Sequence, residues 1–538
     1  MLRPEEGGRV ASDAAARTFE FIGVRRDRVR GQGWTDPSTP RLWRFHLNGF
    51  RWAWAMAADA GGWGPALAAL VEEWRIANPP RRGDPWHPVV TAERLLSLLG
   101  TRALWLPHVR DPEVMSRWLW RHVHFVRTAL ERDVGGNHLI REAASLVAAG
   151  VAFRSSRLEA RAIRLLTRAI GHQVLPDGGH EERSPSYHLE VLMDLAEVRS
   201  LLPSHHPFQR SLRPVLDRMA DFGASLCHPD GNVAMFNDCT PWPVPAIEFL
   251  QTLGLDPHLG RWFPESGYYV LGDGEDLLFF DAGPPSPPDL PPHAHCDLLA
   301  IEVSVGGRRI LVNSGTGDYA RGDWRDYWRS TRAHNTVEVD RTEQSEVWHS
   351  FRMARRASPL DVDVLDRPDG VVVTAAHDGY RRLRPAVTHR RLVARLDRGW
   401  VVVDTLEGAG RHSLRSFLHL QPEVNPAEVE GAFILERGGS RLAVCPLGGL
   451  HVALRGARTE PVENWVAETL GRREPGLALV MEATVALPAL FGWVLLPGAG
   501  TLQARIEGTP PWFRVIVQDE HGERVVDPGL LAGAGSGA

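Results

Sequence analysis

The chain has 538 residues, more than one hydrophobic core usually supports, so its length predicts two or three domains. Hydrophobic residues make up 43% of the chain and charged residues 24%, which excludes a disordered protein. A net charge of −5 provides no general attraction to nucleic acid or anionic membranes, so we expect neither as a partner. No apolar run reaches the roughly 18–20 residues of a membrane-spanning helix, so we expect no membrane span.

The N-terminus and the cysteines bear on the cellular compartment. The first residues lack the charged-then-apolar order of a secretory signal, which predicts a cytoplasmic protein, with the periplasm or cell envelope as the alternative. The chain contains no CxxC pair, so neither a disulfide framework nor a zinc-thiolate site is indicated. A reducing compartment fits this pattern.

Helices are predicted throughout the first half. Apolar residues recur at three-to-four spacing in the segments 65–78, 91–106, 113–133, 138–153, 159–174, 186–202 and 207–226. Two loops between them are similar, Pro176–Gly179 and Pro229–Asn232, which predicts a repeated helical hairpin. Ten of the 19 tryptophans precede residue 121, and we expect most of those ten to be core residues.

The pattern changes near residues 263–267. Beyond them, short alternating or β-branched runs are separated by Gly, Asp and Pro, which predicts an all-β sandwich of many strands. The sequence therefore predicts a multidomain α+β protein. We place a helical domain at residues 1–264, a β-sandwich domain at 265–525 and a flexible low-complexity tail at 526–538.

Two polar clusters mark the helical half. Asn137 and His138 stand in a break between two predicted helices, where Asn is ordinarily a helix cap. A polar loop about fifty residues further on contains Glu181 and ends in Tyr187 and His188, again at a helix start. Such a loop is also compatible with a simple solvated connection.

Three polar segments mark the β half. His293 and His295 precede a predicted strand, where alternation would place both imidazoles on one face. Asn313 and Tyr319 follow the next strand, and His334 comes after a further connection. The imidazole pair, a carboxamide oxygen and a further imidazole could bind a metal, although Asn is a poorer ligand than Asp.

In this order the motifs resemble those of the heparinase II/III-like polysaccharide lyases. The matching motifs are Asn-His, Asp-Gly-Gly with a following Tyr-His, HxHxD, NSGTGDY and HNTVEVD, and the resemblance covers roughly residues 20–510. It implies an incomplete α/α toroid joined to an antiparallel β-sandwich. It also implies cleavage of an acidic, uronic-acid-containing polysaccharide by β-elimination.

The resemblance assigns roles residue by residue. Asn137 and His138 match the pair that contacts the uronate carboxylate, and Tyr187 matches a tyrosine that acts as base or acid. His293 matches the first histidine of the β-domain motif, and Tyr319 is the nearest match to a second catalytic tyrosine. We expect a tyrosine to serve as base or acid if nearby cations lower its pKa. The order of the roles among the two tyrosines and His293 is open. Glu181 and His188 are expected to bind substrate.

The family's structural zinc ligands correspond to His295, Asn313 and His334, with Asn313 in place of the usual Asp. A bound zinc ion and a neutral hydrogen-bonded His–Asn–His cluster are both open.

Two other functions compete with the lyase. A glycoside hydrolase would use two carboxylates, for which Asp177, Glu181 and Glu182 are the candidates, although acids in an exposed loop are usually solvated. A non-catalytic glycan-binding protein of envelope polysaccharide metabolism would keep the cleft without turnover. A monomer and a homodimer are equally compatible with the sequence.

Overall fold

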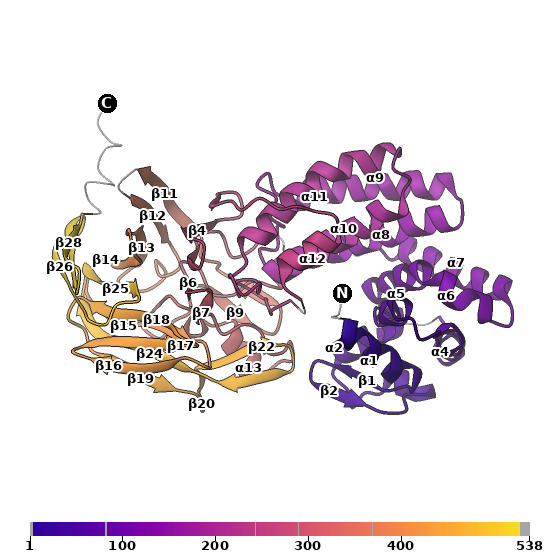
Figure 1. Ribbon diagram of the computed structural model, residues 1–538, viewed down its shortest axis with the longest axis horizontal. Coiled ribbons are helices and arrows are strands. Elements are labelled where there is room, and N and C mark those ends of the chain that lie inside the picture. Colours follow the sequence, from indigo (N-terminus) through magenta and orange to yellow (C-terminus); the bar gives the residue numbers. More distant parts are fainter. Residues whose placement is uncertain (1–3, 81–82, 243, 289, 368–369, 528–538) are drawn as a thin grey trace.

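The computed structural model describes residues 4–80, 83–242, 244–288, 290–367 and 370–527. Figure 1 shows a helical half, indigo to magenta, beside a half built of strands, which runs to yellow at its C-terminal end. The predicted order, helical domain and then β domain, is confirmed.

The helices of the first half follow one another as antiparallel pairs around a shared core, the arrangement of an incomplete α/α toroid. They are α1 (Pro4–Ala15), α2 (Arg41–Gly49), α3 (Ala53–Ala58), α4 (Gly64–Ala77), α5 (Pro88–Gly100), α6 (Arg102–Trp105), α7 (Pro112–Thr128), α8 (Gly136–Ala152), α9 (Ser156–Gln173), α10 (Pro185–Leu201), α11 (Pro207–Ser225) and α12 (Ala246–Thr252). A short hairpin, β1 (Phe19–Phe21) and β2 (Val24–Arg26), packs beside α2. Within the described residues, no helix combines the length and hydropathy needed to cross a bilayer.

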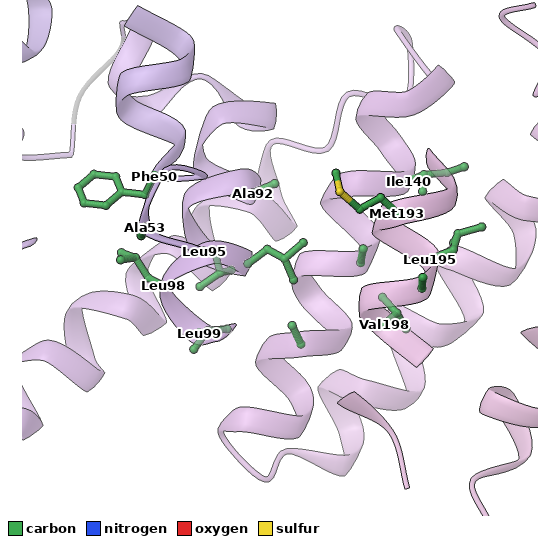
Figure 2. Packing of buried hydrophobic residues seen from close by; sticks show 14 of the residues in the cluster. Phe50, Ala53, Ala92, Leu95, Leu98, Leu99, Ile140, Met193, Leu195 and Val198 are labelled. Carbon is green, nitrogen blue, oxygen red and sulfur yellow. The ribbon is translucent and has the colours of Figure 1, made fainter. Parts of the chain in front are cut away.

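Helix α8 lies at the centre of this half, in contact with α5, α7, α9 and α10. Its apolar residues continue around most of the helix, as expected when neighbours cover several faces. Figure 2 shows Leu95 of α5, Ile140 of α8 and Leu195 of α10 within this core. The prediction for the tryptophans is confirmed for most of them. Trp34, Trp43, Trp74 and Trp105 are fully buried, whereas Trp54 and Trp120 are partly exposed.

The two similar loops have the same backbone structure. After α9, Leu175 N–H donates to the carbonyl of Gly179, and after α11, His228 N–H donates to the carbonyl of Asn232. Each loop is closed by an antiparallel bridge, Val174 with His180 and Cys227 with Val233. The predicted helical-hairpin repeat is therefore confirmed. The second copy leads directly to the domain junction.

Two large antiparallel sheets form the β half. In spatial order, the first contains β11 (Pro359–Arg367), β12 (Gly370–His377), β13 (Val387–Arg395), β14 (Trp400–Gly408), β25 (Ala489–Pro497), β18 (Ser440–Leu447), β17 (Ala432–Arg437) and β16 (Asn425–Val429). The second contains β19 (Val452–Gly456), β24 (Leu477–Ala486), β15 (Arg411–Leu420), β7 (Arg308–Leu311), β6 (Ile301–Val305), β5 (Asp276–Asp281), β4 (Tyr268–Asp273) and β3 (Trp262–Phe263), with β8 (Val337–Val339) paired to β15. Their facing side chains form one core, so the structure is a β-sandwich.

Smaller elements complete this half. They are the hairpin of β9 (Glu346–Trp348) and β10 (Arg352–Ala354), the pairs β20 (Arg458–Thr459) with β21 (Val462–Glu463) and β22 (Trp465–Thr469) with β23 (Arg472–Pro475), the short helix α13 (Asp323–Trp328), and a sheet of β26 (Leu502–Thr509), β27 (Trp512–Asp519) and β28 (Gly522–Val526). The last sheet packs on the outer face of β14 and β25, which explains why Val401 and Val403 are buried as well as Val402. Of the predicted tail, Val526 belongs to β28 and residues 528–538 lie outside the described residues.

A buried polar cluster joins the two halves. His228, at the second repeated loop, places Nε2 2.8 Å from Glu302 Oε2 and Nδ1 2.6 Å from Ser304 Oγ, both on β6. The same carboxylate accepts the backbone N–H groups of Met235 and Asn313. The cluster is buried on every side, so we interpret it as a structural link between the loop and the sheet.

Replacing His228 with Ala should therefore lower the free energy of unfolding by about 3 kcal/mol, because it leaves a buried carboxylate and hydroxyl without their partner. Denaturant unfolding measures the change. His258→Ala is the matched control, because the His258 side chain is 89% exposed and its surface pair contributes little. Equal stability of the two variants would contradict the structural role of His228.

Candidate active site at the domain junction

A buried carboxylate, Asp238, lies where the two halves meet. His293 Nδ1 lies 3.0 Å from Oδ2 and His295 Nε2 lies 2.8 Å from Oδ1, while Arg325 of α13 donates to both oxygens. Burial alone would raise the pKa of Asp238, but the Arg325 charge and the two imidazole hydrogen bonds lower it well below its usual range. Asp238 is therefore a carboxylate that orients both histidines.

This carboxylate decides which nitrogen of His293 carries the hydrogen. A carboxylate only accepts, so Nδ1 of His293 donates to Asp238 and Nε2 keeps its lone pair. The strand predicted after His293 and His295 is present as β6, which begins at Ile301, but strand alternation does not apply to the two histidines because they lie before it. The two imidazoles converge because both bind Asp238, one at each oxygen.

Two tyrosines from opposite halves meet beside His293. Tyr187 Oη lies 3.0 Å from Tyr319 Oη, and the rings of Tyr187 and His293 have their centroids 4.0 Å apart. Ser184 places Tyr187, because it caps α10 by accepting from the Tyr187 N–H while its hydroxyl donates to the Asp238 carbonyl at 2.6 Å. The helix start and the Asp238 loop are thus held together by one side chain.

Both tyrosines stay protonated at neutral pH. Burial, together with the neighbouring Tyr319 hydroxyl, raises the pKa of Tyr187 well above its ordinary value. Burial and the Asp238 charge do the same for Tyr319, and they outweigh Arg325, whose guanidinium carbon lies 4.9 Å from the Tyr319 ring centroid. Nearby cations therefore do not lower the pKa of either tyrosine below its ordinary value, contrary to what the sequence suggested. In this state each hydroxyl is suited to donating a proton.

Asn137 and His138 occupy the first turn of α8. Gly135 is the N-cap residue and no side chain caps this helix, so Asn137 is not a cap. Its backbone N–H donates to Glu182 Oε1, and within the described residues its side-chain amide has no hydrogen-bond partner. His138 is partly exposed, with Nδ1 3.2 Å from Glu131 Oε2. The amide of Asn137 is therefore available to a ligand.

Gly136 fixes how closely this turn approaches the rest of the site. Its φ is +55°, in the region that favours glycine, and a Cβ there would lie 2.0 Å from Glu182 Oε1 and 2.8 Å from Leu290 Cδ2. Leu290 belongs to the segment that leads to His293. The absence of a side chain thus allows α8 to contact both the Glu182 loop and the His293 segment.

Two residues predicted to bind substrate do not lie in the site. His188 is 1% exposed, its Nε2 donates to the Met219 carbonyl at 2.8 Å, and burial lowers its pKa to about 3. It is a neutral core residue, because helix periodicity turns it away from the face that carries Tyr187. Glu181 is buried, and its carboxylate lies 3.2 Å from His172 Nδ1 on α9, so it pairs with that histidine and not with the groups around His293.

The loop acids are not arranged as a hydrolase pair. The loop was expected to be exposed, but Glu181 and Glu182 are both buried. Asp177 accepts hydrogen bonds from Ser266 and the Gly179 N–H, and Glu182 accepts from Asn137 N–H. These carboxylates are thus used in structural hydrogen bonds.

A second buried cluster, His295, Asp297 and His334, adjoins Asp238. Their ligand atoms all lie within 4.8 Å of one another. His295 Nε2 donates to Asp238 and His334 Nδ1 donates to the Ser330 carbonyl, so the two remaining nitrogens, 3.2 Å apart, both carry lone pairs. Burial lowers the pKa of His295 to about 4, which keeps it neutral, and Asp297 Oδ1 has no hydrogen-bond partner in the described part of the chain. These groups fit a divalent cation.

Asn313, predicted as the third ligand, is placed differently. Its amide oxygen accepts the Asn335 N–H at 3.0 Å, and its NH₂ group has no partner among the described residues. An NH₂ group donates and cannot bind a cation. Asp297 supplies the carboxylate instead, and the expectation for Asn313 is corrected accordingly.

Three residues of the site were not predicted from the sequence: Asp238, Asp297 and Arg325. Asp297 stands in the HxHxD motif, so its spacing from His295 was an available signal. Asp238 and Arg325 lie 87 residues apart in unremarkable polar contexts, and no sequence pattern pairs them. Only the fold brings them into contact.

The chain is similar in sequence to a known protein family. It matches the family model "Heparinase II/III N-terminus" over residues 68–252 and "Heparinase II/III-like, C-terminal" over residues 256–494. A heparin-sulfate lyase of Bacteroides stercoris is 25% identical over 62% of this chain and 53% of that protein. The FtsZ-localized protein C of Caulobacter vibrioides is 25% identical over 69% of this chain and 65% of that protein. The chain thus spans less than two thirds of these relatives.

Solved structures share the fold across nearly the whole chain. A crystal structure of heparinase III matches with a TM-score of 0.76 and 16% identity, covering 98% of this chain and 91% of that one. A heparan sulfate lyase structure from Pedobacter heparinus matches with a TM-score of 0.64 and 20% identity, covering 97% and 89% of the two chains. The predicted toroid and sandwich architecture is thereby confirmed.

Replacing Asp238 with Asn should destabilise the fold by about 3–5 kcal/mol at neutral pH, because the buried Arg325 loses its counter-charge. The folded pKa of Asp238 is lower than the unfolded value of about 3.9, so its contribution is complete above that value and is lost as pH falls toward the folded pKa. Unfolding measured from pH 7 downward should show a constant difference between the two proteins until about pH 4 and a shrinking one below it. Asp217→Asn, on an exposed helical face, is the control and should change little. A difference that grows toward acid would contradict this account of Asp238.

Proposed function

The chain belongs to the heparinase II/III-like family, and on that premise we propose that it is a polysaccharide lyase that cleaves an acidic, uronic-acid-containing polysaccharide by β-elimination. One observation carries the proposal: Tyr187, Tyr319 and His293 are in contact across the domain junction. A proton acceptor and a proton donor thus lie side by side, partly open to solvent.

His293 is the base in this mechanism. In the neutral ring Nδ1 donates to Asp238, so Nε2 carries the lone pair that can accept a proton. The Asp238 carboxylate then stabilises the imidazolium that forms. Nε2 takes the proton from C5 of the uronate. The electrons of the C5–H bond form the C4=C5 double bond as the C4–O4 bond breaks. Asp238 is a positioning residue, since it touches His293 and not the substrate.

Tyr187 is the acid. Its raised pKa keeps the hydroxyl protonated, so it can deliver that proton to the departing O4. Tyr319, hydrogen-bonded to the same hydroxyl, stabilises the phenolate that results and fixes its orientation. Exchange with solvent then returns the proton from His293 and restores Tyr187, so no water is added to the product.

Asn137 and His138 bind the uronate carboxylate. The C5 proton becomes acidic only when the charge of that carboxylate is offset, because further negative charge develops beside it in the transition state. The unpartnered amide of Asn137 donates to it. Glu131 accepts the Nδ1–H of His138, so His138 donates to the uronate carboxylate from Nε2 as the imidazolium, in which both ring nitrogens carry hydrogen.

The competing functions have less support. A hydrolase needs two carboxylates flanking the bond, whereas Asp238, the carboxylate that orients His293, is saturated by Arg325 and two histidines. A glycan-binding protein without turnover would not need an oriented base beside a protonated tyrosine.

Elimination predicts a specific product. Incubation with a panel of uronic-acid polysaccharides, heparan sulfate first, should raise the ultraviolet absorbance of the C4=C5 double bond with at least one of them. The same reaction in heavy-oxygen water should leave the cleaved bond unlabelled. Label at the new chain end would identify a hydrolase and overturn the proposal.

Removing the acid should abolish turnover without unfolding the protein. Tyr187→Phe is expected to lower kcat about 10²–10⁴-fold, because the proton for O4 is lost while the ring still packs on His293. Tyr269→Phe in β4 is the control, because within the described residues its hydroxyl has no hydrogen-bond partner. Steady-state rates and melting curves of both variants test this. Equal rates in the two variants would remove Tyr187 from the mechanism.

We also propose that His295, Asp297 and His334 bind zinc. His and Asp are common zinc ligands, and the His295–Asp238 hydrogen bond is the second contact that such a histidine usually makes. When bound, the ion supplies structural order, and none of the proton transfers above passes through it. A neutral hydrogen-bonded cluster fits less well, because the two facing nitrogens lack a hydrogen between them.

Elemental analysis tests the zinc site. Protein purified without chelator should contain zinc, and Asp297→Asn should lose it, since the carboxylate ligand is gone. Asn313→Asp is the comparison, because the new oxygen would replace the unpartnered NH₂ group; it should retain zinc and melt at higher temperature when zinc is added. If neither the unchanged protein nor the Asn313→Asp variant contains zinc, the zinc site is excluded.

A further inference from the structure

The β9–β10 hairpin is held against the active site by its inner face. Val347 pairs with Met353 across the two strands, and both pack on Ala294 and Cys296, which flank the histidines of the β half. The opposite face carries Trp348 paired with Arg352. Side chains alternate across a strand, so this second face is directed away from the core.

Two buried arginines anchor the turn of the hairpin. Arg325, which binds Asp238, donates from Nε to the Ser350 carbonyl at 2.9 Å, and Arg329 donates to the His349 carbonyl at 3.0 Å. His349 has a φ of +60°, a conformation that these bonds maintain. The turn therefore has a defined position relative to the catalytic groups.

The hairpin presents one exposed aromatic side chain beside Tyr319 and a second one on its outer face. Phe351 is 40% exposed, and its ring centroid lies 5.7 Å from that of Tyr319. Trp348 is 57% exposed and has no aromatic ring packed on it among the described residues. Single exposed apolar residues need no explanation, but here Phe351 continues the surface of a proposed catalytic residue and Trp348 is exposed on the same hairpin.

A free cation lies next to these rings. Arg352 is exposed, shares a face with Trp348, and within the described residues its guanidinium makes no ion pair or hydrogen bond. Figure 1 places β9 on the side of the β half that faces the helices. A flat apolar surface with an adjacent unpaired cation matches a pyranose ring that bears an acidic group.

We propose that Trp348, Phe351 and Arg352 form a subsite for an anionic sugar next to the cleavage point; this rests on the proposed lyase function. The C–H face of the sugar ring stacks on Trp348 and Phe351, and its carboxylate or sulfate binds Arg352. The subsite gives the enzyme affinity for chains longer than the two sugars that flank the bond. A protein partner would need a larger apolar patch than these two rings provide.

Oligosaccharide binding tests the subsite without turnover. The Tyr187→Phe protein is titrated calorimetrically with a tetrasaccharide and a decasaccharide of heparan sulfate. Adding Trp348→Ala should raise the Kd for the decasaccharide about tenfold, which corresponds to about 1.4 kcal/mol, and Trp348→Phe should recover most of the affinity. Arg352→Gln should weaken binding and reduce its salt dependence. Trp512→Ala, which removes a 69% exposed tryptophan from β27, is the matched control and should leave the Kd unchanged.

The outcomes separate this inference from the lyase proposal. Unchanged decasaccharide affinity in folded Trp348→Ala, Phe351→Ala and Arg352→Gln variants would overturn the subsite even if the enzyme eliminates. Binding that depends on Trp348, without unsaturated product from the protein carrying Tyr187, would overturn the lyase proposal and retain the subsite. Failure of oligosaccharides from every polysaccharide of the panel to bind would overturn both.

Discussion

The ion pair between Asp238 and Arg325 is the interaction on which the rest of the site depends. Neither charge is exposed to water, so each requires the other, and the pair can form only when the end of the helical half meets α13 of the β half. Arg325 also binds the Ser350 carbonyl, and Asp238 also binds His293 and His295. One buried pair thereby fixes the base, the second histidine and the hairpin turn in a single arrangement.

Under the lyase proposal, the two protonation states needed for elimination follow from burial and from this arrangement. Burial raises the pKa of both tyrosines, and the Asp238 carboxylate that accepts from His293 Nδ1 raises that of Tyr319 further. Base and acid are therefore distinguished by their surroundings at one pH. Ser184 positions Tyr187 of the helical half, because it caps α10 at Tyr187 and donates a hydrogen bond to the Asp238 carbonyl. Each half of the protein supplies one proton-transfer group.

The cation cluster and the base share Asp238. His295 and His293 bind opposite oxygens of that carboxylate, so one buried group orients both imidazoles. Under the zinc proposal the ion would stabilise the buried residues next to Asp238 and would take no part in the proton transfers. Asp297 provides the proposed zinc site with the negative charge that the amide of Asn313, the ligand predicted from the sequence, lacks.

The sequence by itself determined the two architectures and much of the site. Apolar spacing predicted the helices and strands, the paired loops predicted the repeat, and the motifs led to Asn137, Tyr187, His293 and Tyr319, because periodicity and short motifs are local properties. The tertiary structure alone decided that His188 is a core residue one position from Tyr187. It also decided that the Asn313 amide oxygen accepts a backbone N–H and that Asp238 accepts hydrogen bonds from the histidines. Burial, hydrogen-bond partners and charge pairing between residues far apart in the chain are set by packing, and no local pattern encodes them.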